Sequence, residues 1–202
     1  MRLFDELPTV ADGELQKLGR KPPTTDYVPL HGGYDKHKVI FPRRPGPSPS
    51  TTTWEPHEQL DQLGSEALWD ELARRSFALS GVSDEPSKIS VPGARALWLD
   101  EELAKGPAEA FVIEREFAHI HPRPDSSLHL QLPLELAVFA ISAGWAEVHT
   151  TCWLGDAPAN SVMLFSPRNE QELEVIWDLV QESYRFATGQ PSKFEVTPHI
   201  TE

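Results

Sequence analysis

Residues 115–132 read REFAHIHPRPDSSLHLQL, and this stretch decides the fold. Apolar residues alternate with polar ones on both sides of residues 122–126, a segment of two prolines, an arginine, an aspartate and a serine. Such a segment is typical of a tight turn between two strands. The stretch therefore predicts a β-hairpin whose side chains point alternately to the two faces of a sheet.

The register of this hairpin places three histidines. A register that pairs His121 with Ser127 also pairs His119 with His129, so that all three imidazoles lie on one face of the sheet. The apolar residues between them then lie on the opposite face, against the helices. On the imidazole face we also expect Arg115, Phe117 and Gln131.

The rest of the chain supplies further strands and helices. Apolar residues at helical spacing predict helices over 56–79, 134–143 and 169–188. Successive strands joined by short connections pair antiparallel, so we predict an α+β fold with a single antiparallel β-sheet and helices packed on one face. The strands are expected at 87–91, 95–99, 110–121, 127–132, 145–149 and 162–165.

Proline is concentrated in the first quarter of the chain, which predicts an extended Pro-rich N-terminal arm over residues 1–55. A free linker has no need of aromatic residues, so we expect the arm to lie on the domain and to cover the imidazole face. The domain is expected over 56–190, followed by a C-terminal tail over 191–202. The aromatic residues of the arm are Tyr27, Tyr34, Phe41 and Trp54.

Composition limits the possible partners. With 18 Lys and Arg against 31 Asp and Glu, the net charge is −13, which argues against sequence-independent binding to nucleic acid. No apolar run is long enough to span a membrane. The chain opens with acidic residues instead of a signal peptide and has one cysteine, Cys152, so a cytoplasmic location is expected. Cys152 is expected to be a packed thiol.

Three imidazoles on one face can move protons, hold a metal ion, or pack and form hydrogen bonds. No carboxylate is obviously placed beside them, so no metal is predicted; if one binds, its ligands would be His119, His121 and His129. Strand alternation turns Glu116 toward the helices, where an ion pair with Arg168 or Arg185 is expected to hold it.

Four motifs carry a family resemblance. They are REFAHIH at 115–121, SLHL at 127–130, Gly144-Trp145 followed by His149, and SPRNE at 166–170. In order and spacing they resemble the luciferase-like domain typified by the luciferase of luminous fungi. The residues after Trp145 depart from the fungal pattern, which favours a homologue that is not luminous.

The resemblance implies an oxygenase that uses molecular oxygen as co-substrate, without flavin or haem, on a hydroxylated aromatic or pyrone-like small molecule such as 3-hydroxyhispidin. It implies His119 or His129 as the base and His121 as a proton relay. The other implied roles are charge stabilisation by Arg115 or His149, and substrate contact by Trp145, Phe117 and Gln131. The alternatives are a non-catalytic small-molecule binding module and a His-coordinated metalloprotein.

Overall fold

The computed structural model describes residues 42–194. Six strands form one sheet in the order β1-β2-β3-β4-β6-β5, and every neighbouring pair is antiparallel. The strands are β1 Val82–Pro86, β2 Arg95–Leu99, β3 Glu116–Ile120, β4 Leu128–Gln131, β5 Ala146–Val148 and β6 Ser161–Leu164.

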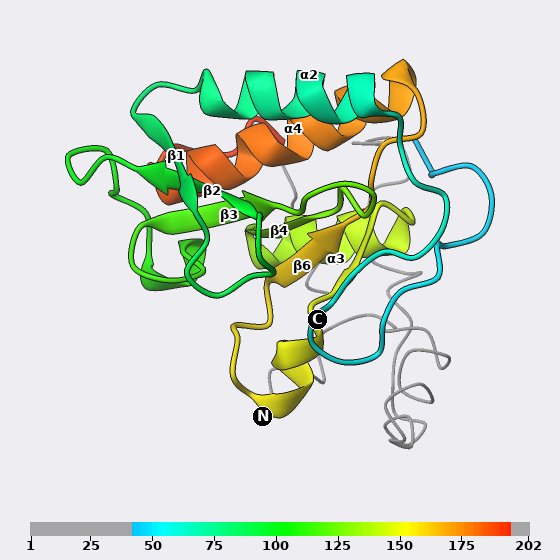
Figure 1. The fold of residues 1–202 in the computed structure, drawn as a ribbon. Helices are drawn as coiled ribbons and strands as arrows, with labels where there is room; N and C mark the ends of the chain where they lie inside the picture. The colour runs from blue at the N-terminus through cyan, green and yellow to red at the C-terminus, as the bar shows by residue number, and fades with distance from the viewer. Residues whose placement is uncertain (1–41, 195–202) are drawn as a thin grey trace.

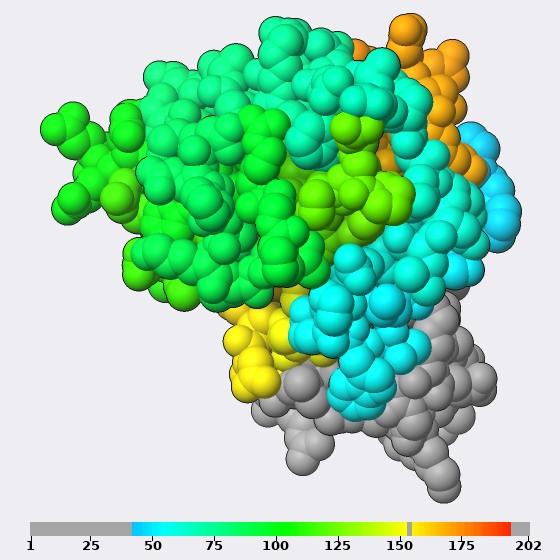
Figure 2. Space-filling model, in the orientation of Figure 1, coloured from blue at the N-terminus to red at the C-terminus, as the bar shows by residue number. Residues whose placement is uncertain are grey.

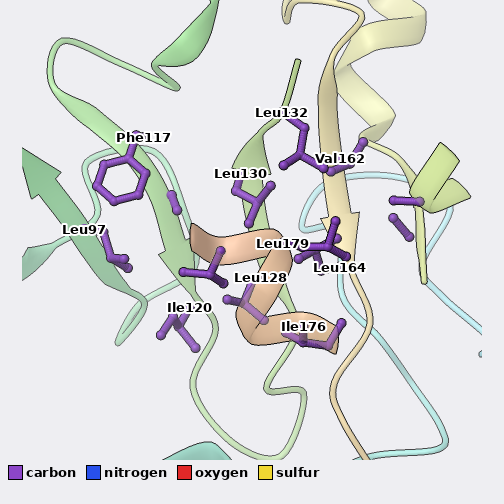
Figure 3. Packing of buried hydrophobic residues seen from close by; sticks show 14 of the residues in the cluster. Leu97, Phe117, Ile120, Leu128, Leu130, Leu132, Val162, Leu164, Ile176 and Leu179 are labelled. Atoms are coloured by element: carbon purple, nitrogen blue, oxygen red, sulfur yellow. The ribbon is translucent and has the colours of Figure 1, made fainter. Parts of the chain in front are cut away.

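Within residues 42–194, three α-helices accompany the sheet: α2 Glu66–Phe77, α3 Leu134–Ser142 and α4 Glu170–Ala187. Figure 1 shows α2 and α4 lying side by side over the sheet, and buried residues of all three helices belong to one apolar core. In Figure 3, Ile176 and Leu179 of α4 lie against Leu128 and Leu164 of the sheet. The predicted α+β fold is confirmed.

Strand β3 pairs with β4 in the register that the sequence predicts. His119 lies opposite His129, and the backbone N–H of His121 donates to the carbonyl oxygen of Ser127 at 2.9 Å. Period-two alternation then sends the apolar residues of the hairpin into the helix-facing core and the imidazoles to the other face. The core residues of the hairpin are Ala118, Ile120, Leu128 and Leu130.

Alternation fails at the start of β3, where the pairing with β2 shifts. Leu97 pairs with Ala118, but the next residue, Trp98, pairs with Glu116, so Phe117 is the extra residue of a bulge. Phe117 therefore enters the core beside Ala118, and its expected place on the imidazole face was wrong. The same shift turns the Glu116 side chain to the imidazole face.

Several element boundaries differ from the predicted ones. The helix expected over 56–79 begins only after its N-cap, Ser65, and residues 56–65 are irregular. The strand expected at 87–91 lies earlier in the chain, at β1. Residues 87–94 connect β1 to β2, and Gly93, with a φ of +89°, forms part of the turn before β2. The strand expected over 110–121 starts at Glu116, after the 3₁₀ turn η3 Ala108–Ala110 and a turn at 113–116.

Residues 42–65, called the strap below, run along the domain (Figures 1 and 2). The indole N–H of Trp145 donates to the carbonyl oxygen of Pro42 at 2.7 Å. Farther along, the amide group of Gln59 accepts from the backbone N–H of Ser166, and its own backbone N–H donates to Asp125. Of the aromatic residues expected to cover the domain, Trp54 is exposed; the other three lie outside the described residues.

A buried carboxylate holds the start of the strap. Glu172 of α4 is 3% exposed, accepts hydrogen bonds from the guanidinium of Arg168 and lies 3.8 Å from that of Arg44. Burial alone would raise the pKa of Glu172, but the hydrogen bonds from Arg168 and the charge of Arg44 outweigh it, so the pKa lies below its usual value. Arg168 also donates to Gln62 of the strap.

This network predicts a pH-dependent loss of stability. Replacing Glu172→Gln should lower the free energy of unfolding by about 2 kcal/mol near neutral pH, because it removes a buried charge-assisted contact. A lowered folded pKa stabilises the protein above the ordinary carboxyl value of 4.5, and this contribution disappears as the pH falls through the folded pKa. Denaturant unfolding at several pH values measures the difference.

Glu174→Gln is the matched control, because Glu174 lies on the same helix and pairs with Arg75 at the surface. Its stability should change little. A Glu172→Gln effect that stays constant down to low pH would contradict the assignment.

Candidate functional site

Five histidines form one cluster on the sheet face opposite the helices. His119 and His129 come from β3 and β4, His121 follows β3, His149 follows β5, and His57 comes from the strap. Ring centroids lie 4.2 Å apart for His129 and His149 and 4.5 Å apart for His121 and His129. The rings of His119 and His121 stack at 5.5 Å. His129 is the centre of the cluster, since its ring contacts all four others.

Carboxylates hold three of the five rings. Glu116 lies 2.7 Å from Nδ1 of His119, and Asp125 contacts Nδ1 of His121. Glu147 lies 2.7 Å from Nε2 of His57. The sequence did not indicate a carboxylate on this face, but the bulge, the hairpin turn and strand β5 each supply one.

Each carboxylate fixes which nitrogen of its ring carries the proton, because an ionised carboxylate only accepts hydrogen bonds. His119 therefore carries its proton on Nδ1, and its Nε2 lies 3.2 Å from Nδ1 of His129. Nδ1 of His129 also lies 3.0 Å from Nε2 of His149, whose Nδ1 accepts from the backbone N–H of Thr151. By the same reasoning His57 keeps a lone pair on Nδ1, and His121 keeps one on Nε2, 3.0 Å from the hydroxyl of Ser90.

Three of the five imidazoles favour the uncharged form near neutral pH. Burial lowers the pKa of His129 well below its ordinary value, and the neighbouring imidazoles lower it further. Burial and the same neighbours lower the pKa of His149 to about 3. Burial also lowers the pKa of His119, against the opposing pull of Glu116. Neutral imidazoles can accept protons and bind metals, which protonated ones cannot.

The cluster forms one side of a cavity of about 570 Å³, a size that suits a small organic molecule. The strap closes part of it through Glu55, Pro56 and His57, and residues 89–92 of the β1–β2 connection form another wall. No Lys or Arg is among the lining residues in the described part of the chain. All five clustered histidines, together with Gln131, line this cavity.

The structure separates the other predicted site residues from the cavity. Arg115 is exposed and donates to the carbonyl oxygen of Leu99, because the bulge changes the alternation before β3. Trp145 is 2% exposed and packs in the core, since it precedes β5 and its indole N–H points to the strap. The cavity lining therefore includes none of Arg115, Phe117 and Trp145.

The expected ion pair between Glu116 and Arg168 was wrong. Glu116 accepts from His119 and from the hydroxyl of Ser87, whereas Arg168 binds Glu172. The bulge is the physical reason, because it turns the Glu116 side chain away from the helices and toward the imidazole face.

Sequence reasoning missed three residues of the site and assigned a fourth, Glu116, to the wrong face. Glu147 alternates with two core residues of β5, so the predicted strand over 145–149 contained a signal for it. Asp125 lies in the predicted turn, next to the histidine strand. Glu116 requires the bulge, and His57 lies 62 residues before His119 in the chain, so no local pattern connects it to the cluster.

Comparison with known proteins agrees with this description. Residues 114–183 match the family model described as the luciferase domain, so this part of the chain is similar to that family. Proteins named luciferase from Armillaria gallica and from Neonothopanus nambi are each 32% identical to it over 81 residues, which is 39% of this chain. The chain spans 30% of the length of these curated relatives. No solved structure matches the chain.

The single cysteine, Cys152, is expected to be chemically inert in the folded protein. It is fully buried, and burial raises the pKa of its thiol to about 12, so almost no thiolate forms at about pH 8. Iodoacetamide should leave the native protein unmodified by mass spectrometry and should alkylate it once in denaturant. Alkylation of the native protein at the rate of the denatured one would show that the thiol is accessible.

Proposed function

We propose that this protein oxygenates a hydroxylated aromatic or pyrone-like molecule in the histidine-lined cavity, with dioxygen as oxidant and without flavin or haem. The observation that carries the proposal is a small-molecule cavity lined by five imidazoles, three of which are oriented by carboxylates. The likeness to proteins named luciferase supports a reaction of this class.

Proton transfer begins the proposed reaction. Of the two predicted bases, His119 has its Nε2 3.2 Å from the ring of His129, and His129 is enclosed by the other four imidazoles. Nε2 of His121, the predicted proton relay, contacts a serine hydroxyl that lines the cavity, so His121 takes the role of the base in this proposal. A substrate hydroxyl that displaces Ser90 would transfer its proton to Nε2 of His121, and Asp125 would stabilise the imidazolium. The product of this step is the substrate enolate or phenolate.

Oxygen addition follows from that anion. An electron-rich enolate carbon forms a bond to dioxygen, so the substrate is oxidised by two electrons and dioxygen is reduced to a carbon-bound peroxide. The apolar walls of the cavity, which include Ile89, Val91 and Val112, limit access of water to the anion. The proton held by His121 returns to the peroxide.

The test measures oxygen consumption with a panel of hydroxypyrones and catechols in an oxygen electrode. At least one compound should be consumed with dioxygen by the full chain, and His121→Gln should reduce the rate by about 100-fold or more, since a general base contributes that much. Circular dichroism should show the variant folded.

Arg115→Gln is the control variant, since Arg115 lies outside the cavity, and it should keep the wild-type rate. Compounds that bind without oxygen uptake would contradict catalysis and favour a non-catalytic binding module. Equal loss in both variants would point to a general effect on the fold.

A further inference from the structure

Two imidazole nitrogens of the cluster are buried without a hydrogen-bond partner among the residues that the structure describes. They are Nδ1 of His57 and Nε2 of His129. Both residues are at least 96% buried and both nitrogen atoms are inaccessible, so bulk water does not satisfy them. Buried polar atoms are almost always paired, and an unpaired one calls for a specific explanation.

Each of the two rings has an acceptor opposite its unpartnered nitrogen. Glu147 lies 2.7 Å from Nε2 of His57, and Nε2 of His119, itself oriented by Glu116, lies 3.2 Å from Nδ1 of His129. An imidazole whose N–H is taken up on one side of the ring can offer the lone pair of its other nitrogen to a metal ion. Metal-ligating histidines usually have such an acceptor for the opposite N–H.

A third imidazole completes the group. One ring nitrogen from each of His57, His129 and His149 lies within 4.8 Å of the other two. Nδ1 of His149 accepts from the backbone N–H of Thr151 at 3.2 Å, and its Nε2 lies 3.0 Å from Nδ1 of His129. All three rings line the cavity, so an ion bound to them would face a substrate.

A second group of three imidazoles also converges, namely His119, His121 and His129. This second group contains only one of the two unpartnered nitrogens, Nε2 of His129, and Nε2 of His121 lies 3.0 Å from the hydroxyl of Ser90. The group that includes His57 contains both unpartnered nitrogens, and they favour it.

We propose that His57, His129 and His149 bind one divalent transition-metal ion of the kind that prefers imidazole ligands. Glu147 and His119 are positioning residues for this site. The ion would supply the positive charge that the cavity otherwise lacks, since its lining in the described chain includes Glu55 and Asp156 but no Lys or Arg. The role of this positive charge in catalysis rests on the proposed function, whereas the binding of the metal ion does not depend on it.

Titration of the metal-stripped full chain with Co²⁺ tests the site, because Co²⁺ on imidazoles absorbs visible light. One equivalent should bind and give a ligand-field spectrum. His57→Gln and His149→Gln should each weaken binding by about 100-fold or more, and Glu147→Gln by about 10-fold to 100-fold, because it only orients a ligand.

Two controls distinguish the possible causes of a change in Co²⁺ binding. Binding should persist in a chain with His31, His37 and His199 replaced by asparagine, which excludes histidines outside the described residues as the source of the signal. His121→Gln should keep Co²⁺ and lose oxygen uptake, so failure of the metal site and failure of the oxygenase are distinguishable.

Two results would overturn the proposal. One is the lack of stoichiometric binding by the full chain. The other is wild-type affinity in both His57→Gln and His149→Gln, with loss in His121→Gln, which would place the ion on the other group.

Discussion

The antiparallel pairing of β3 with β4 is the constraint on which the rest of the structure depends. In the observed register His119 lies opposite His129, and the apolar residues between the imidazoles point to the other face. A shift by one residue would bring imidazoles against the helices and apolar side chains into the cavity. The same pairing thus makes the core and the histidine face at once, and neither can change without the other.

Two irregular features convert this face into a site. The bulge at Phe117 turns one carboxylate, Glu116, onto the imidazole face and places a phenyl ring in the core. The strap adds His57 and closes one side of the cavity. It is held in place by the contact of its Arg44 with Glu172 and by the hydrogen bond that its Gln59 accepts from Ser166. Strands β3 and β4 supply His119 and His129, whereas irregular backbone supplies the other three histidines and covers part of the cavity.

The luciferase-like segment and the strap contribute different parts of the site. Residues 114–183 include four of the five clustered histidines and all three carboxylates that hold rings. His57 and the strap residues around it lie outside that segment. The wall of the cavity is therefore divided between the segment that matches the family model and the strap, which lies outside that match.

The sequence by itself determined the sheet, its helix-covered face and the clustering of His119, His121 and His129, because hydrophobic alternation and a proline-rich turn are local properties of the chain. Only the tertiary structure decided which carboxylates face the imidazoles, that Arg115, Phe117 and Trp145 lie away from the cavity, and that His57 joins the cluster. A bulge depends on how two strands pack against a shared core. The position of the strap depends on contacts between residues far apart in the chain, such as Gln59 and Ser166. Neither leaves a periodic signal in the sequence.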